Sequence, residues 1–232
     1  MDCEDADPRG VGVVNDGVRV VRDVHGQHFV SVTAAMRLVK MLLGEELDSY
    51  GPEALNRIHQ VEGIACHAVC LDYCAWRLQL LPEFTPPVWD RTVHPDQCRF
   101  QNVIQMALAG FMEFLEQYQV RPITVEQEAV SVPYGLIGHI DLLCSLLWQG
   151  RRVKAIVDLK FVSHLLMTHH LQVRLYSKLA GVTAQLGLLY HGNRETGSWA
   201  VKPVDLTIGQ DDVLAVSYAA RLYSWAAQKG RG

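Results

Sequence analysis

Three charged residues stand in the most apolar part of this 232-residue chain. Asp141 lies in the stretch GHIDLLCSLLW, whereas Asp158 and Lys160 lie in VKAIVDLK, and the polar turn QGRR separates the two stretches. Both stretches have the composition of buried strands. A charge on a buried strand is costly unless it is paired or binds an ion, so these residues require a chemical explanation.

The spacing of these charges indicates a metal site. Alternate residues of a strand share a face, so Asp158 and Lys160 are expected side by side. The QGRR turn would fold the first strand back and bring Asp141 near Asp158. Mg²⁺ would relieve the repulsion between two carboxylates, and a lysine beside it suits metal-assisted hydrolysis of a phosphodiester. The alternative is a structural ion pair between Asp158 and Lys160 at a strand end.

The segment after these strands offers a second polar pair. In HHLQVRLYSKL, Gln172 and Tyr176 are four residues apart and therefore lie on one helical face. A leucine at every fourth position forms the neighbouring stripe, which would pack on the sheet. Gln172 and Tyr176 would then overhang the sheet edge where Lys160 emerges. Their alternative role is the polar border of an amphipathic helix.

Elements of alternating type must position these residues. Helical spacing covers residues 51–81 and 96–120, and three strands are expected within 121–162. A helix is expected over 169–187, followed by a strand on each side of NRETGS and a closing helix over 211–228. Two short strand-like runs precede a helix that Ser31 or Thr33 would cap. This order predicts an α/β (α+β) fold with a central mixed β-sheet flanked by helices.

The domain organisation follows from the same pass along the chain. We expect a tail and short β element in 1–27, with residues 1–10 disordered, and a single domain over 28–232. That domain divides into a helical part at 31–120, a core at 121–190, and C-terminal strands and a helix at 191–232.

Composition limits the setting and the partners. The formal net charge of −4 argues against a generally basic nucleic-acid coat, so any DNA contact is expected in a local groove. The six cysteines and the acidic, polar start MDCEDADPRG favour a reduced cytoplasmic setting with free thiols. No apolar run reaches the roughly 18 residues of a membrane span.

The polar residues of the central region resemble the PD-(D/E)XK nuclease superfamily, and most closely its RecB-like exonuclease branch. The matching residues are Asp141 in GHID, Asp158 and Lys160 in IVDLK, and Gln172 and Tyr176 in QVRLY. This branch also carries a glycine and a histidine on an upstream helix, for which EGIACH offers Gly63 and His67. Four short motifs in the correct order, over about residues 28–190, make the resemblance fairly specific.

The resemblance implies a restriction-endonuclease-like core and a role for each matching residue. Asp141 and Asp158 would bind Mg²⁺ or Mn²⁺, with the backbone carbonyl of Leu159 and the imidazole of His67 completing the protein ligands. Lys160 would position the attacking water or stabilise the pentavalent phosphate.

Two further residues complete the implied active site. Gln172 and Tyr176 would orient Lys160 or the DNA backbone. The implied activity is a metal-dependent deoxyribonuclease.

Acidic and basic residues around this set are weaker candidates. Glu126 and Glu128 share a face of TVEQEAVSV, and Glu126 is the preferred additional contact to the metal or its water. Solvated edge positions are the alternative for both. Arg174 and Lys178 flank the Gln172–Tyr176 face and would reach phosphates or solvent.

Histidines and cysteines nearby have less specific spacing. His164, His169 and His170 follow the charged strand without a clean metal-binding spacing, so a role near the substrate and a surface position both stay open. The cysteines at 66, 70 and 74 are expected to be buried small hydrophobes. No cysteine follows Cys144, so we expect no iron–sulfur cluster of the kind that some relatives hold.

The function that the resemblance implies is a DNA exonuclease of phage- or prophage-type recombination or repair. The resemblance further implies a single-strand annealing protein as a partner and a ring-shaped homo-oligomer. A structure-specific endonuclease and a non-catalytic DNA-binding or assembly module on the same fold are the alternatives.

Overall fold

The computed structural model describes residues 11–14, 18–22, 28–43, 53–85 and 95–229, and the expectation for residues 1–10 lies outside them. The helices are α1 (Val32–Leu43), α2 (Glu53–Arg77), α3 (Pro95–Gln117), α4 (Met167–Leu179) and α5 (Gln210–Lys229). The strands are β1 (Val11–Val14), β2 (Val18–Arg22), β3 (His28–Ser31), β4 (Arg121–Ser131), β5 (Leu136–Trp148), β6 (Arg151–Lys160), β7 (Leu186–Gly192) and β8 (Trp199–Val204).

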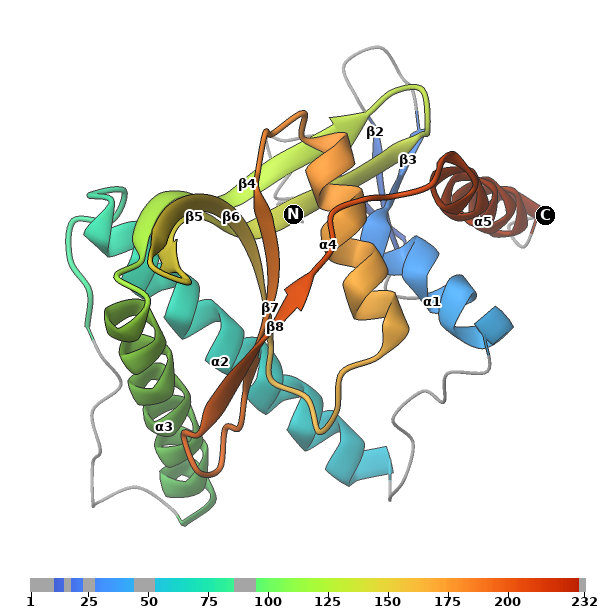
Figure 1. The fold of residues 1–232 in the computed structure, drawn as a ribbon. Helices are drawn as coiled ribbons and strands as arrows, with labels where there is room; N and C mark the ends of the chain where they lie inside the picture. Colours follow the sequence, from blue (N-terminus) through green and yellow to red (C-terminus); the bar gives the residue numbers. More distant parts are fainter. Residues whose placement is uncertain (1–10, 15–17, 23–27, 44–52, 86–94, 230–232) are drawn as a thin grey trace.

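The eight described strands form one mixed sheet (Figure 1). Its order is β1-β2-β3-β5-β6-β7-β8, and β4 pairs with β5. The β3–β5 and β6–β7 pairs are parallel, whereas the other pairs are antiparallel. The predicted mixed sheet flanked by helices is therefore confirmed. Because β2 pairs with β3, the strands before residue 28 belong to the same sheet as the rest of the chain.

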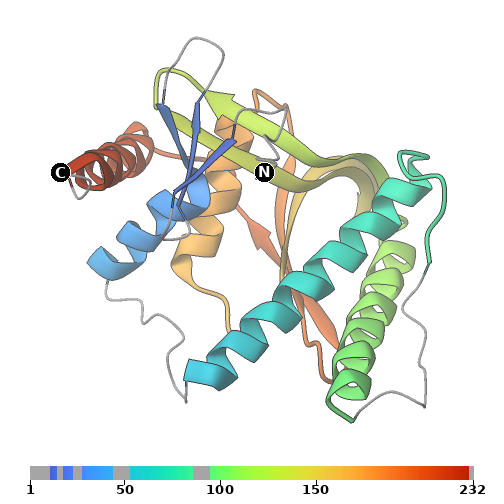
Figure 2. The same cartoon turned by 180° about the vertical axis from the view of Figure 1, so that it is seen from behind.

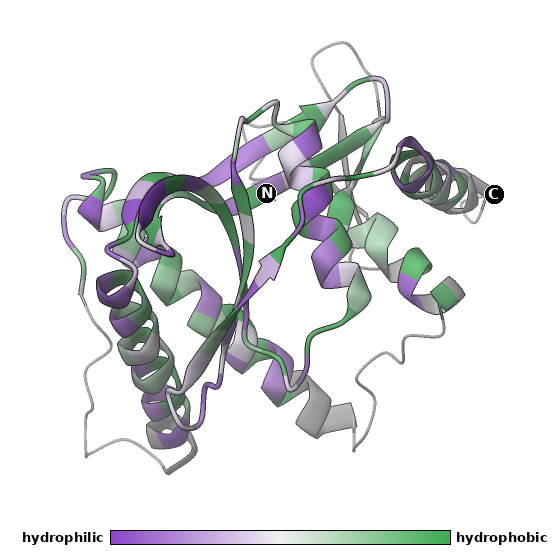
Figure 3. Cartoon of the chain, viewed as in Figure 1, coloured by the Kyte–Doolittle hydropathy of each residue, from purple (hydrophilic) through white to green (hydrophobic). Residues whose placement is uncertain are grey.

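Two helix layers cover opposite faces of the sheet, as the front and back views show (Figures 1 and 2). One core cluster joins α1, α4 and α5 to the sheet and includes Ile156. The other joins α2 and α3 to the sheet and includes Val157 and Leu159. The alternating pattern of β6 thus serves two cores, as strand periodicity requires. Figure 3 shows hydrophilic residues along α3 on the side turned away from the sheet.

Local signals explain most element boundaries. The backbone N–H of Ala34 donates to Oγ of Ser31 at 3.1 Å, so Ser31 is the residue that caps α1. Gln149 and Gly150 both have positive φ, which suits the two-residue hairpin turn between β5 and β6.

The predicted end of the helix after β6 is wrong. The helix expected over 169–187 begins two residues earlier, at Met167, and ends at Leu179. Gly181 has a φ of +59°, and a left-handed glycine just past the last turn ends a helix. The remaining residues lead into β7. Within the described part of the chain, no helix combines the length and apolarity that a membrane crossing requires.

Candidate metal centre

The two predicted aspartates lie where two strands separate. The antiparallel ladder of β5 and β6 runs from Trp148 opposite Arg151 to Leu142 opposite Val157. The next opposed positions in this register are Asp141 and Asp158. Beyond them β6 continues its pairing with β7 as far as Lys160, so β6 diverges from β5. We call this point, between Asp141 of β5 and Asp158 of β6, the fork.

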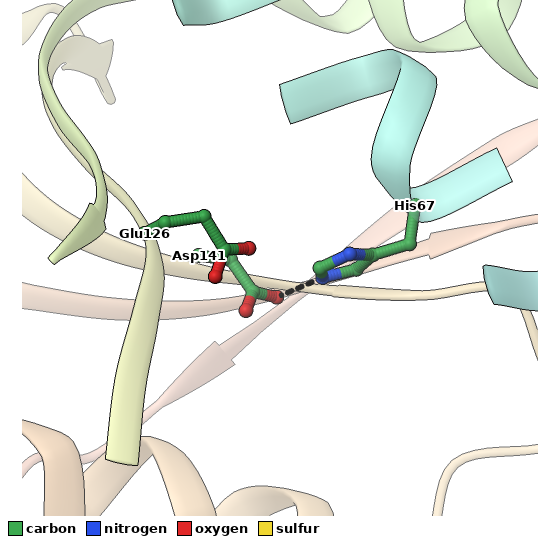
Figure 4. Close-up of side chains that lie close together, drawn as sticks. All are labelled: His67, Glu126 and Asp141. Atoms are coloured by element: carbon green, nitrogen blue, oxygen red, sulfur yellow. Dashed lines mark ion pairs between the residues drawn. The ribbon is translucent and has the colours of Figure 1, made fainter. Parts of the chain in front are cut away.

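Asp141 is anchored at the fork by two donors. Its Oδ2 accepts the backbone N–H of Leu159 at 2.7 Å and lies 3.0 Å from Nε2 of His67 (Figure 4). The Asp141 residue is only 8% exposed. These contacts hold one carboxylate against both β6 and α2, although Asp141 itself belongs to β5.

Glu126 approaches the same point from β4. The β4–β5 register pairs Val125 with Leu142 and Gln127 with Ile140, which places Glu126 and Asp141 in opposed positions. Glu126 has a φ of 49°, a left-handed conformation that a residue with a side chain rarely adopts. One ligand atom from each of His67, Glu126 and Asp141 lies within 4.8 Å of the others. The prediction that Glu126 rather than Glu128 belongs with the metal ligands agrees with this grouping.

Asp158 and Lys160 form a buried ion pair beside this group. Asp158 is 1% exposed, its Oδ2 lies 2.6 Å from Nζ of Lys160, and its Oδ1 has no hydrogen-bond partner. Burial raises the pKa of Asp158, Lys160 opposes that rise, and the neighbouring Asp141 adds to it. Burial would lower the pKa of Lys160, but Asp158 and Asp141 outweigh it and raise that pKa. Lys160 is therefore an ammonium at neutral pH.

The other carboxylates and His67 are electrostatically linked. Burial would lower the pKa of His67, but its contact with Asp141 reverses the effect and raises it. Burial likewise opposes ionisation of Asp141, yet His67, Lys160 and the Leu159 N–H together lower its pKa. Burial and the nearby Asp141 raise the pKa of Glu126. Asp141 thus depends on neighbouring positive groups and a backbone donor, whereas burial and Asp141 oppose the ionisation of Glu126.

A cleft of about 1770 Å³ opens onto the fork. Most of the predicted site residues line it, namely His67, Glu126, Asp141, Leu159, Lys160, Gln172 and Tyr176. Asp158 lies beneath this surface, in contact with Lys160. The structure therefore brings together residues from five elements, α2, β4, β5, β6 and α4, that the sequence separates by up to about a hundred positions.

Gln172 and Tyr176 lie on one face of α4, as predicted. Nε2 of Gln172 donates to Oη of Tyr176 at 2.8 Å, and the Tyr176 residue is 3% exposed. The ring packs on Gly138 of β5, where an added Cβ would lie 2.5 Å from Cε1 of Tyr176. Close packing of α4 on β5 therefore depends on a glycine three residues before Asp141.

Arg174 and Lys178 are not among the residues that line the cleft. Nε of Arg174 donates to the backbone carbonyl of Asp205 at 2.9 Å, which directs the guanidinium toward the loop after β8. Lys178 is exposed in the last turn of α4. Contact of either residue with DNA stays a prediction, and it would have to occur outside this cleft.

The three histidines after β6 have different surroundings. His164 and His169 line the cleft, whereas His170 is not among its lining residues. Nδ1 of His169 accepts the backbone N–H of Leu166 at 3.1 Å. Burial and nearby Lys160 lower the pKa of His169 to about 3, so it stays neutral and caps the start of α4.

The predicted burial of the α2 cysteines is confirmed. Cys66, Cys70 and Cys74 are each 0% exposed, and so is Cys144 on β5. All four are free thiols in the core between α2, α3 and the sheet. Burial raises the pKa of Cys66 to about 12, so this thiol stays protonated and unreactive.

The residues at the fork could hold a divalent cation. They offer carboxylate oxygens and one imidazole, and Asp158 contributes a buried oxygen that has no hydrogen-bond partner. An unpartnered buried carboxylate oxygen is expensive in a purely structural site. The donor set suits Mg²⁺ or Mn²⁺, which prefer oxygen ligands. The carbonyl of Leu159 as a further ligand stays a prediction.

Sequence reasoning missed a second charged cluster at the end of the cleft. Arg194, in the turn between β7 and β8, lies 3.2 Å through its Nε from Oε2 of Glu62 on α2. The sequence around Arg194, NRETGS, has the composition of an ordinary solvated turn. A glutamate within α2 likewise carries no local sign of burial, so no signal in the sequence could have joined these two residues.

Comparison with known proteins adds little to this description. No protein-family model and no curated protein matches the chain. Nineteen chains among solved structures do match. One is titled "Crystal structure of SSO0001", with 13% identity and a TM-score of 0.32. The match covers 49% of this chain and 56% of that one, so it spans little more than half of that structure. At this similarity it carries no argument about function.

Proposed function

We propose that this protein is a Mg²⁺- or Mn²⁺-dependent nuclease that hydrolyses phosphodiester bonds of DNA, and that linear DNA ends are its substrate. The observation that carries the proposal is the fork. Two aspartates occupy opposed positions where the β5–β6 ladder ends, and a lysine is ion-paired to one of them. The motif resemblance supports the same reaction.

The environment of the fork supports metal binding over a purely structural ion pair. A structural pair explains Asp158 and Lys160, but it does not explain why Asp141, Glu126 and His67 converge beside them. Three neighbouring carboxylates, of which Asp158 and Glu126 have raised pKa values, are a costly arrangement without a cation. When bound, a divalent ion would activate a water molecule and stabilise the charge that develops on the phosphate.

The protein groups have separate roles in this proposal. Asp141 and Asp158 would hold the metal by carboxylate oxygens, with His67 and Glu126 completing the site. Lys160 keeps its proton at neutral pH because of Asp158 and Asp141, so it acts as a cationic donor toward phosphate and not as a base. The resemblance implies that Lys160 positions the attacking water or stabilises the phosphate, and its positive charge favours the second role.

The cleft suits a polymeric substrate. Pockets for drug-sized molecules enclose roughly 300–1,000 Å³. The cleft at the fork measures about 1770 Å³, and it carries basic, polar and aromatic side chains besides the acidic group. A segment of nucleic acid would fill it better than a small ligand. Action beside an annealing protein, and a ring-shaped oligomer, stay predictions from the resemblance.

A digestion assay tests the proposed function. End-labelled linear duplex, linear single strand and closed circular DNA are incubated with Mg²⁺, Mn²⁺ or EDTA. We expect metal-dependent loss of linear DNA and survival of the circle. Asp158→Ala and Lys160→Ala should each abolish the loss, whereas Arg151→Ala, at the far hairpin tip, should not.

Two other results of the digestion assay would change the proposal. Cutting of the circle would assign the protein to the endonucleases. Absence of cleavage on every substrate, together with absence of metal binding by calorimetry, would contradict the proposal. The non-catalytic DNA-binding module would then explain the fold better.

A further inference from the structure

Arg194 joins three separate parts of the chain at the end of the cleft. Its Nη1 donates to the backbone carbonyls of Phe161 at 3.1 Å and His59 at 3.3 Å, and its Nη2 contacts Nδ1 of His59. Its Nε lies 3.2 Å from Oε2 of Glu62. The Arg194 side chain is 16% exposed, so these contacts occupy a largely buried guanidinium. Most of its donors are directed at protein groups and not at the cleft.

These contacts connect the two halves of the candidate metal centre. Phe161 directly follows Lys160, at the end of the strand that carries Asp158. His59 and Glu62 lie on α2, eight and five residues before His67. Arg194 itself lies 135 positions after His59 in the chain. A single side chain from the β7–β8 turn therefore ties α2 to the end of β6.

The chemistry of the cluster favours a rigid connection. Glu62 is 2% exposed, and a buried carboxylate is stable only when it is paired. A guanidinium presents five N–H donors in a planar, fixed arrangement, so it can donate to two carbonyls while it forms an ion pair with a carboxylate. A lysine ammonium could neutralise Glu62 but could not reproduce this geometry. The arrangement therefore specifies arginine and not merely positive charge.

We propose that Arg194 is a positioning residue that fixes the distance between His67 on α2 and the Asp158–Lys160 pair on β6. The inference rests on the proposed metal centre, and it adds a requirement that the motif residues do not include. Loss of the Arg194 contacts leaves every proposed metal ligand in the chain but frees α2 and β6 to separate. Substitution of a residue that orients a metal ligand typically lowers metal affinity by about 10- to 100-fold.

Arg99 provides a matched control. Its Nε lies 3.6 Å from Oε1 of the same Glu62 carboxylate, but its side chain is 55% exposed. Exposed ion pairs contribute little to stability. Both arginines therefore face one acid, whereas Arg194 also donates to the carbonyl of Phe161. If Arg194 acted only by neutralising Glu62, substitution of either arginine would lower Mn²⁺ affinity, and only the size of the loss would differ.

The test measures Mn²⁺ affinity by calorimetry on folded protein, together with the thermal midpoint of unfolding. We expect Arg194→Gln and Arg194→Lys each to weaken Mn²⁺ binding about tenfold or more. Arg99→Gln should change affinity by less than about twofold. A merely structural role would lower the midpoint and leave the affinity of the folded protein unchanged.

Further variants keep the inference falsifiable. Should Arg194→Gln unfold because the buried Glu62 loses its buried cationic partner, the double variant Glu62→Gln/Arg194→Gln removes both charges. The folded double variant should show the same weakened Mn²⁺ binding as Arg194→Gln. Wild-type affinity in a folded Arg194 variant, or an equal loss in Arg99→Gln, would overturn the inference. Failure of the wild type itself to bind Mn²⁺ would instead overturn the metal centre, and it is recognised before any variant is made.

Discussion

Asp141 and Asp158 occupy opposed positions one step beyond the last pair of the β5–β6 ladder, Leu142 with Val157. Two like charges at this point disfavour further backbone pairing between β5 and β6. The divergence of β6 from β5 opens the space that the cleft occupies. Because Leu159 still donates its N–H to Asp141, the strands stay connected through a side chain where backbone pairing ends. The same residues thus end the ladder and form the candidate site.

The left-handed backbone of Glu126 leads to a prediction about stability. Side chains in this conformation cost roughly 1–2 kcal/mol, and glycine avoids the cost. Glu126→Gly should therefore be more stable than Glu126→Ala by about 1 kcal/mol, measured by urea unfolding without metal. The two variants should show the same decrease in metal affinity relative to wild type because both lack the carboxylate. Equal stability of the two variants would show that the backbone at residue 126 is not held at positive φ.

Metal binding at the fork should depend on pH through His67. Asp141 raises the pKa of His67 above its ordinary value of 6.5, and only the neutral imidazole can bind a metal. Mn²⁺ affinity should therefore rise between pH 6 and pH 8, with release of protons. Calorimetry in buffers of different ionisation enthalpy measures that release. His67→Gln should bind Mn²⁺ more weakly than wild type and lose most of the pH dependence. An equal change of Mn²⁺ affinity with pH in the two proteins would show that His67 is not a metal ligand.

Without metal, the contact between His67 and Asp141 should stabilise the fold within a defined pH range. The raised pKa of His67 contributes stability that is full below 6.5 and is lost as pH rises through the folded-state value. The lowered pKa of Asp141 contributes stability above 3.8 that is lost as pH falls through its folded-state value. The contribution is therefore greatest between these limits.

The effect of this pair is measured by unfolding in EDTA. The free energy of unfolding of wild type should exceed that of His67→Gln by more at pH 5.5 than at pH 9. We expect the change in that difference to be about 1 kcal/mol or less, because His67 is partly exposed. A difference that is the same at both pH values would contradict the assigned interaction.

Two glycines near the site should respond to alanine in opposite directions. Gly138→Ala places a Cβ 2.5 Å from Cε1 of the buried Tyr176, so we expect a loss of about 1–3 kcal/mol in the free energy of unfolding. A Cβ added at Gly63 on α2 would meet only an ordinary contact, 3.6 Å from the carbonyl oxygen of Phe161. Gly63→Ala should therefore increase stability by up to about 1 kcal/mol through helix propensity. Destabilisation by both variants would contradict the packing described around Tyr176.

Periodicity and the QGRR turn were sufficient to predict that Asp141 lies near Asp158. The alternation in IVDLK determines which residues share a face, and a polar turn between two apolar strands indicates a hairpin. The exact register of that hairpin, and the point where its strands diverge, come only from the structure. The helical spacing of Gln172 and Tyr176 similarly determines their common face. These predictions hold because each depends on contacts between residues close in sequence.

Predictions that depend on long-range packing could not be made in this way. Arg194 and Glu62 are joined only once β7, β8 and α2 are in place, and neither residue stands in a distinctive local pattern. The positive φ of Glu126 also has no sign in a glutamate, because the surrounding sheet imposes it. Arg174 has the right spacing to flank the Gln172–Tyr176 face, but a carbonyl from the loop after β8 binds its guanidinium.

The central claim is that the fork between β5 and β6 binds a divalent metal. The most direct test is an anomalous difference map from crystals soaked in Mn²⁺, compared with crystals of Asp158→Asn treated identically. The account predicts a peak within coordination distance of Asp141 and Asp158 in the wild type and a much weaker one in the variant. A wild-type map without a peak at the fork, with Lys160 still paired to Asp158, would contradict it.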